Sequence, residues 1–313
     1  VFSTGMGGYT ESLTDPSFKG EILMSTYPLE GNHGVSEDWY QSDRIQVEGF
    51  VCREVCRELS NFGPQKTLDD FLKEFETPGI SGVDTRDLTL KIRERGSLKA
   101  AITTEDIADD KLIEMAKSQP SIEDIDIVHK VSTKEIKLFN EDADTKVALI
   151  DCGVKKNIIN SFLERDIGVI LFPYDTDYKT ILDYSPSGLM ITSGPGNPDR
   201  VTETIETMKK LSNMLPIFGI CMGQQLIYVY FELRRRVEER GYTGDLVKAI
   251  CEYRDEQGPD FSVLEAVSNH HGELLPRGNE DAAKHDVNIV PGTLLHRVLG
   301  KDTMRIASFH YLH

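Results

Sequence analysis

The spacing of hydrophobic positions changes near residue 146. From there, short apolar runs alternate with segments in which apolar residues recur three and four positions apart, which predicts strands alternating with amphipathic helices. The predicted strands cover residues 147–150, 168–172, 188–191 and 215–220. The predicted helices cover residues 156–165, 178–184 and 202–211. This alternation indicates a mainly parallel sheet flanked by helices.

The first 140 residues follow a less regular pattern. A β-like run at residues 21–27 and a glycine-rich turn at 31–34 precede segments with helical spacing. Helices are predicted over residues 67–76, 85–96 and 104–118, whereas the polar residues 129–145 show no period and predict a linker. The expected fold class is α/β, with a mixed α and β domain at 1–140 and a sheet domain at 146–313.

Composition narrows the functional classes. The 313 residues carry 35 Lys and Arg against 52 Asp and Glu, a net charge of −17, which argues against nucleic acid as a partner. No apolar stretch approaches the ~20 residues of a membrane span, so we expect no membrane partner. The five cysteines are scattered without a Cys-x-x-Cys pair, which favours a reducing, cytoplasmic compartment. The histidines lack metal-ligand spacing, and no metal is predicted.

Cys221 is the candidate nucleophile. It stands in Gly219-Ile220-Cys221-Met222-Gly223, between a predicted strand and a predicted helix. The flanking glycines permit the sharp turn of a nucleophile elbow, and the following helix N-terminus is expected to lower the pKa of the thiol. A buried structural cysteine is the alternative interpretation.

A second glycine-bearing loop follows the preceding predicted strand. Residues 192–198 read Thr-Ser-Gly-Pro-Gly-Asn-Pro, in which Gly and Pro fix a rigid turn. Free backbone N–H groups of this loop, together with the N–H of Met222, are expected to form an oxyanion hole beside Cys221. Both loops fall at the carboxyl ends of strands, where ligands of such sheets bind.

These two loops resemble the signatures of class I glutamine amidotransferases. Residues 148–158 further resemble the opening strand and helix of the carbamoyl-phosphate synthase small chain, as do segments of the N-terminal domain, and the resemblance covers residues 1 to about 226. The N-terminal segments are residues 4–9, 13–17, 26–28, 31–34 and 80–86.

The resemblance implies a function and a binding site. L-Glutamine is expected to bind at Gly194, Gly196, Met222 and Gln225, and a Cys–His–Glu triad is expected to release ammonia. A large synthase subunit then makes carbamoyl phosphate from bicarbonate and ATP. ATP and Mg²⁺ belong to that partner, and no cofactor is expected in this chain, which has no Gly-x-x-x-x-Gly-Lys-[Ser/Thr] loop.

The C-terminal part departs from the small-chain pattern. Residues 285–300 look more like gamma-glutamyl hydrolases of the same superfamily. The superfamily supplies the catalytic base as His-x-Glu, and His310 is the preferred candidate although Leu312 occupies the Glu position. His271 and Glu273 have the correct spacing but come early in the chain. We therefore expect a chain truncated at its start and its end, or a chimera.

Three functions remain open from the sequence. The first is a glutamine-hydrolysing subunit with Cys221 as nucleophile, and the second is a catalytically impaired binding or regulatory subunit. The third is a gamma-glutamyl hydrolase, against which the N-terminal domain argues. Because the triad is incomplete, we expect slow glutamine hydrolysis alongside rapid alkylation of Cys221.

Overall fold

The computed structural model describes residues 1–59, 66–95, 98–241 and 284–307. The chain divides into two compact units, Val1–Asp260 and Phe261–His313. The first unit contains a four-stranded, a five-stranded and a two-stranded sheet, and the second contains a two-stranded sheet. The α/β class predicted from the sequence is confirmed.

The N-terminal sheet of the first unit is parallel and built from very short strands. Its order is β1-β2-β4-β6, and a separate parallel pair joins β3 and β5. Its helices pack around a core that includes Leu13, Phe50 and Phe71. The strands of the two sheets are β1 Phe2–Ser3, β2 Ile22–Ser25, β3 Leu29–Glu30, β4 Gly49–Val51, β5 Glu54–Val55 and β6 Gly79–Ile80.

Helices α1 Tyr9–Leu13, α2 Leu68–Glu74, α3 Thr85–Arg95 and α4 Asp109–Ser118 belong to this part of the chain, with the 3₁₀ turns η1 Pro16–Phe18 and η2 Glu37–Trp39. Helix α4 begins five residues later than predicted. A local turn precedes it, in which the Glu105 N–H bonds the Thr103 hydroxyl at 3.0 Å and thus competes with helical pairing.

The region predicted as a linker contains regular structure. It includes α5 Val128–Val131, preceded by the 3₁₀ turn η3 Ile122–Asp124, and strand β7 Lys137–Phe139. Strand β7 pairs antiparallel with β9 and forms one edge of the five-stranded sheet. Polar composition alone therefore misled the prediction for residues 129–145, because an edge strand needs no continuous hydrophobic run.

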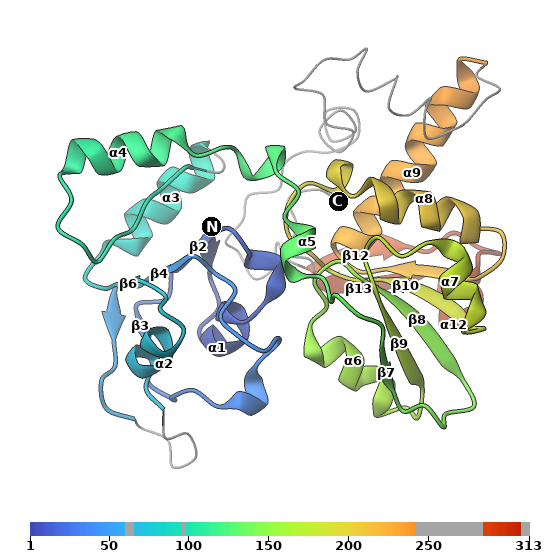
Figure 1. Cartoon of the computed structure of the whole chain (residues 1–313), viewed down its shortest axis with the longest axis horizontal. Coiled ribbons are helices and arrows are strands. Elements are labelled where there is room, and N and C mark those ends of the chain that lie inside the picture. Colours follow the sequence, from blue (N-terminus) through green and yellow to red (C-terminus); the bar gives the residue numbers. More distant parts are fainter. Residues whose placement is uncertain (60–65, 96–97, 242–283, 308–313) are drawn as a thin grey trace. The chain divides into compact units, whose positions relative to one another are not determined.

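The five-stranded sheet has the order β11-β10-β8-β9-β7, and all neighbours except β7 run parallel. Its elements alternate as the sequence predicted (Figure 1). The strands are β8 Lys146–Asp151, β9 Gly168–Pro173, β10 Gly188–Ile191 and β11 Ile217–Gly219. The helices are α6 Lys156–Leu163, α7 Tyr178–Asp183, α8 Thr202–Leu211 and α9 Met222–Glu239, with the 3₁₀ turn η4 Pro198–Arg200 before α8.

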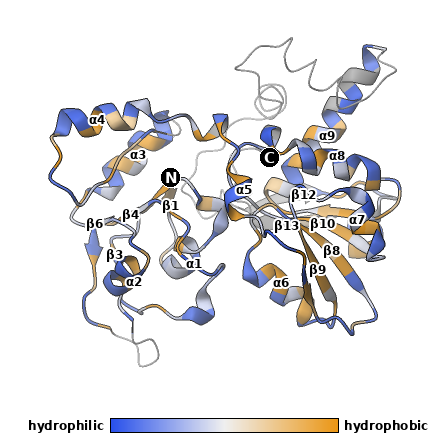
Figure 2. Cartoon of the chain, viewed as in Figure 1, coloured by the Kyte–Doolittle hydropathy of each residue, from blue (hydrophilic) through white to orange (hydrophobic). Residues whose placement is uncertain are grey.

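Both faces of this sheet are buried. Leu149 lies opposite Leu171 and Met190 in the sheet, and this face packs against Ile159 of α6. On the other face, Phe172 meets the Tyr184 ring edge-on at 5.4 Å just after α7. Figure 2 shows the resulting hydrophobic bands along β8, β9 and β10. Burial on both faces explains why these strands are apolar without alternation.

The second unit contains an antiparallel hairpin of strands β12 Lys284–Asn288 and β13 Thr303–Ala307. Helix α12 Leu294–Leu299 lies between them, and the Thr293 hydroxyl caps it by accepting the His296 N–H at 3.2 Å. His296 Nε2 lies 3.0 Å from Asp302 Oδ1. The predicted residues His310, His271 and Glu273 lie outside the described residues.

Candidate active site

Cys221 occupies the sharp turn between strand β11 and helix α9, as the glycine spacing predicted. Its φ of 55° lies in the left-handed region, which is strained for a residue with a side chain. The Ile220 N–H bonds the Ile191 carbonyl and the Gly223 N–H bonds the Thr192 carbonyl, each at 3.1 Å. These bonds fix the turn against the end of β10.

Position 223 requires glycine because the backbone at the end of β10 approaches it closely. A Cβ at this position would lie 2.1 Å from the carbonyl oxygen of Ile191, and a Cβ at Gly219 would lie 2.4 Å from the carbonyl carbon of Gly223. Neither neighbour is a side chain that can rotate away. Both glycines of the motif therefore allow the strand, the turn and the helix to pack without a gap.

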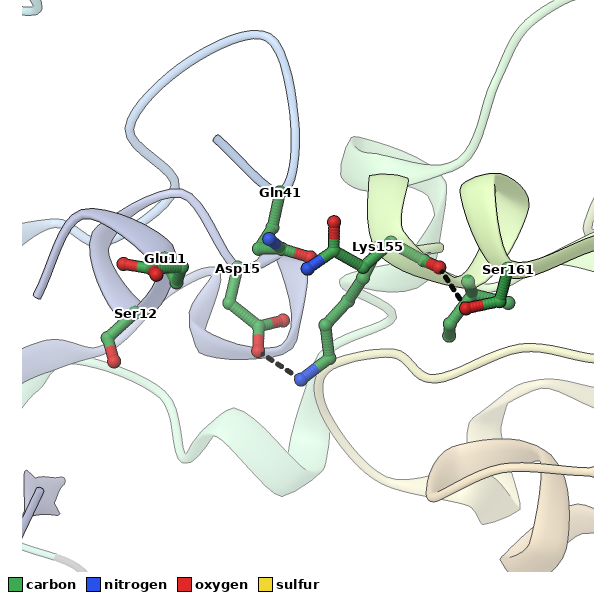
Figure 3. Close-up of a pocket in the computed structure, with 8 residues that line it drawn as sticks. Glu11, Ser12, Asp15, Gln41, Lys155 and Ser161 are labelled. Carbon is green, nitrogen blue, oxygen red and sulfur yellow. Dashed lines mark hydrogen bonds and ion pairs between the residues drawn. The ribbon is translucent and has the colours of Figure 1, made fainter. Parts of the chain in front are cut away.

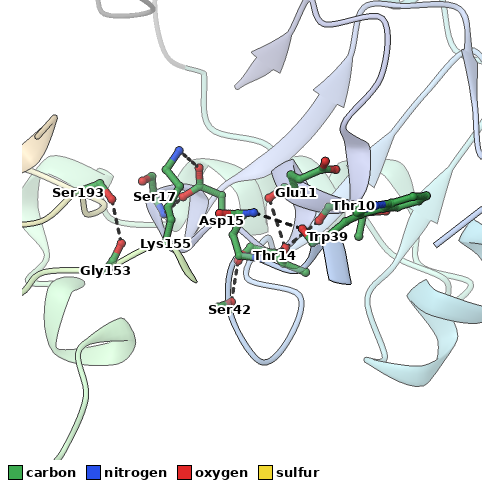
Figure 4. A network of polar contacts seen from close by, with 11 residues as sticks. Thr10, Glu11, Thr14, Asp15, Ser17, Trp39, Ser42, Gly153, Lys155 and Ser193 are labelled. Atoms are coloured by element: carbon green, nitrogen blue, oxygen red, sulfur yellow. Dashed lines mark hydrogen bonds and ion pairs between the residues drawn. The ribbon is translucent and has the colours of Figure 1, made fainter. Parts of the chain in front are cut away.

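The loop after β10, residues 192–198, is held by contacts with the end of strand β8. Gly194 rests on the backbone of Cys152, because a Cβ there would lie 2.2 Å from the Cys152 carbonyl oxygen. The Thr192 hydroxyl accepts the Cys152 N–H at 3.0 Å and donates to the Ser193 carbonyl at 3.1 Å. The Ser193 hydroxyl donates to the Gly153 carbonyl at 3.1 Å, a bond visible in Figure 4. The loop is thus tied to the end of β8.

Two backbone N–H groups converge on Cys221, one from Met222 and one from Gly194. They come from the residue after Cys221 and from a neighbouring loop, the two positions that supply an oxyanion hole at a nucleophile elbow. The role of these two N–H groups as an oxyanion hole stays a prediction.

The thiol is nevertheless not activated within the described residues. Burial raises the pKa of Cys221, and this effect outweighs the lowering by the Met222 N–H, by the charge of Lys155 and by the Gly194 N–H. The Met222 N–H at the helix N-terminus lowers the pKa as expected, but the expected low pKa of the thiol was wrong, because removal of water penalises the thiolate more than the turn stabilises it. A base or a bound substrate has to supply the remaining activation.

The other predicted binding residues surround the elbow. The Met222 side chain is buried, so its backbone rather than its side chain faces the thiol. Gln225 is half-buried in the first turn of α9, and its N–H bonds the Cys221 carbonyl at 3.0 Å. Gly196, with φ of 81°, follows Gly194 in the loop. The roles of these residues in glutamine binding stay predictions.

An ion pair between the N-terminal part and the sheet domain contributes to the site, and the sequence motifs did not predict it. Lys155, at the start of α6, forms an ion pair with Asp15 at 2.7 Å, and both charges act on the Cys221 thiol. Asp15 also accepts the Ser17 N–H at 2.9 Å (Figure 4). The Ser17 hydroxyl is buried and has no hydrogen-bond partner in the described part of the chain. The only sequence signal was that residues 13–17 and 148–158 both carry the family resemblance.

A polar cavity of about 460 Å³ lies beside this ion pair. Glu11, Ser12 and Asp15 line it from the side of α1, and Lys155 and Ser161 line it from the side of α6, with the Asp15 and Lys155 side chains pointing toward one another (Figure 3). The backbone joins the two sides as well, because the Lys156 N–H bonds the Gln41 carbonyl at 2.8 Å. The N-terminal part and the five-stranded sheet are therefore connected next to the thiol.

Among the residues that the structure describes, no group of three or more His, Cys, Asp or Glu side chains could hold a metal ion. No helix in the same ranges is long and apolar enough to cross a membrane.

The sheet and the elbow together define a class. Residues 148–304 match the family model described as glutamine amidotransferase class-I, and residues 1–102 match that of the carbamoyl-phosphate synthase small chain, CPSase domain. The amidotransferase match continues well beyond residue 226. It therefore includes most of the segment that suggested a gamma-glutamyl hydrolase, and that alternative is not favoured.

Curated relatives identify the family within this class. A carbamoyl phosphate synthase small chain of Archaeoglobus fulgidus is 50% identical over 226 residues, which are 72% of this chain and 63% of that protein. One of Methanocaldococcus jannaschii is 50% identical over 74% of this chain and 64% of its own length. One of Methanococcus maripaludis strain C5 is 46% identical over 97% of this chain and 78% of its own length. The chain belongs to the carbamoyl phosphate synthase small chain family and spans somewhat under two thirds of the first two relatives.

Proposed function

We propose that this chain hydrolyses L-glutamine at Cys221 and delivers the ammonia to a large synthase subunit. The observation that carries the proposal is the convergence of the Met222 and Gly194 N–H groups on a thiol held at a strand-to-helix turn. That arrangement suits acyl transfer, because the same two donors can stabilise the oxyanion that forms when the thiol attacks a carbonyl. Gly194, Gly196, Met222 and Gln225 form the proposed glutamine site.

The proposed reaction proceeds through a thioester. Cys221 Sγ attacks the side-chain amide carbon of glutamine, and the thiol proton is transferred through a base to the amide nitrogen. The carbon–nitrogen bond breaks, ammonia leaves and a glutamyl thioester remains. Water then attacks the thioester, which releases glutamate and restores the thiol. His310 remains the proposed base.

The partner is inferred from the family. The relatives that this chain resembles in sequence are named small chains, which implies a large chain, and we propose that ATP, Mg²⁺ and bicarbonate are used there. No cofactor is proposed for this chain. The cytoplasm is the proposed location, and the cysteines at 52, 56, 152 and 221, all free thiols, are consistent with a reducing compartment.

Labelling with a glutamine-analogue electrophile tests the proposal. We expect the label on Cys221 alone, protection by L-glutamine, and loss of ammonia release by at least ~10⁴-fold in Cys221→Ala, the scale on which nucleophile removal acts in serine proteases. Cys56→Ala is the matched control, because that thiol is partly exposed and lies in the N-terminal part. An unlabelled Cys221 in folded protein would overturn the proposal. Labelling without turnover would indicate the impaired subunit instead.

A further inference from the structure

Ile127 fills a space between two glycines that are far apart in the sequence. It is 2% exposed and immediately precedes helix α5. A Cβ at Gly20 would lie 2.4 Å from Ile127 Cδ1, and a Cβ at Gly196 would lie 2.7 Å from Ile127 Cγ2. The two ends of one side chain therefore occupy the positions where side chains at 20 and 196 would stand.

The contact with Gly196 bears on the oxyanion donor two residues earlier. Gly194 lies against the Cys152 carbonyl, and Gly196 lies against Ile127. The loop is thus packed between the end of β8 on one side and Ile127 on the other. Packed interiors transmit strain, so a shift of Ile127 is expected to change the direction of the Gly194 N–H.

We propose that Ile127 is a positioning residue, which keeps the Gly194 N–H directed at Cys221. The direction of this N–H then depends on how Gly20 of the N-terminal part packs against Ile127. Its catalytic consequence rests on the proposed glutamine hydrolysis, whereas its effect on the thiol does not. Neither the sequence motifs nor the family comparisons assign a role to Ile127.

The test uses the two ends of the side chain separately. Gly20→Ala adds a methyl group where Ile127 Cδ1 lies. Because Ile127 is 2% exposed and its Cγ2 already lies against Gly196, the added group should push Ile127 against the loop. Ile127→Val removes Cδ1 and keeps Cγ2, so the double variant should accommodate the added methyl group. The alkylation of Cys221 by iodoacetamide is measured in the full chain as a function of pH, and mass spectrometry of the Cys221 peptide monitors it. The quantity compared is the midpoint, the pH at which the alkylation rate is half its maximum.

We expect Gly20→Ala to raise the midpoint by about 0.5–1 pH unit, because a weakened N–H bond to the thiolate raises the pKa of Cys221. The double variant should return the midpoint to that of Ile127→Val, which is the signature of coupling in a double-mutant cycle. Glutamine turnover should fall ~10-fold in kcat in Gly20→Ala and recover in the double variant, since small misplacements of catalytic groups reduce rates strongly.

Gly82→Ala is the matched control. Gly82 has a φ of 88°, close to the 85° of Gly20, but a Cβ there meets nothing within 4 Å. It therefore reproduces the backbone strain without the contact, and its midpoint should equal that of the wild type. An unchanged midpoint in Gly20→Ala, or a shift that persists in the double variant, overturns the proposal. Since alkylation needs no glutamine, a chain that fails to hydrolyse glutamine still tests the role of Ile127.

Discussion

Buried polar side chains are used differently in the N-terminal part and in the five-stranded sheet of the first unit. In the five-stranded sheet region they fix loops at the carboxyl ends of strands. Asp151 accepts the N–H groups of Gly153, Val154 and Thr133, and Thr204 and Thr207 each donate to a carbonyl in the loop after β9 at 2.7 Å. The strands themselves are apolar, with Ala148, Leu149 and Ile150 fully buried.

In the N-terminal region, polar side chains lie within the interior. Glu30 is 2% exposed and accepts a hydrogen bond from the Ser25 hydroxyl, and Thr14 joins α1 to Gln41 and Ser42. A hydrophobic sheet can thus leave its polar side chains to shape a site at the strand ends, whereas very short strands rely on polar contacts inside the fold. Variants in matched pairs test this contrast.

The largest difference is expected between Gly223→Ala and Gly79→Ala. The new methyl group at 223 would lie 2.1 Å from the Ile191 carbonyl oxygen, which is backbone, whereas at 79 it would lie 2.9 Å from Leu72 Cδ1, the end of a mobile side chain. We expect Gly223→Ala to lower the free energy of unfolding by about 1–3 kcal/mol, and Gly79→Ala by less than about 1 kcal/mol. Urea denaturation measures both, and equal losses would contradict the contrast.

The losses in the free energy of unfolding caused by Thr192→Val and Thr89→Val should differ less than those of the first pair. Valine at 192 leaves the buried Cys152 N–H without its 3.0 Å acceptor, at an expected cost of about 1–3 kcal/mol. Valine at 89 removes bonds to the Thr85 carbonyl and the Thr26 hydroxyl, which is half-buried, so we expect about 0.5–1.5 kcal/mol. Only Thr192→Val should also reduce glutamine hydrolysis, which is measured as ammonia release.

The smallest effect is expected from Glu30→Gln. Burial raises the pKa of Glu30, and the Ser25 hydrogen bond lowers it less. Because the folded-state pKa lies above the unfolded one, the protonated group favours folding at low pH, and this contribution is lost as pH rises through the folded-state pKa. Glutamine cannot ionise, so the variant should lose less stability than the wild type between pH 4.5 and 7.5.

Urea midpoints across this pH range, with exposed Glu54→Gln as the control, measure the change, which we expect to stay below about 1 kcal/mol. A wild-type slope that persists in Glu30→Gln would show that another group controls it.

The sequence predicted the central sheet well because burial on both faces leaves continuous apolar runs, so strands β8 to β11 and helices α6 to α8 were found with ends shifted by no more than two residues. It missed β7, whose three residues Lys137–Phe139 form a strand only through pairing with β9. Such a strand depends on a partner distant in the chain, and no local pattern records it.

The elbow and its loop were predicted from glycine spacing, since close backbone approach demands that residue type. The sign of the thiol pKa shift was not predictable, because it depends on how completely the tertiary structure excludes water from Cys221. Asp15, Lys155 and Ile127 were missed for a related reason. Ordinary charged and aliphatic residues acquire their importance only from neighbours that folding brings together.

The left-handed backbone of Cys221 has an evolutionary consequence. A residue with a side chain incurs about 1–2 kcal/mol in this conformation, and glycine does not. Selection for stability alone would therefore replace Cys221 with glycine. Only selection for a reactive group at this turn opposes that replacement. In homologous chains that have lost their chemistry, residue 221 is where decay should begin, and it should begin by making the protein more stable.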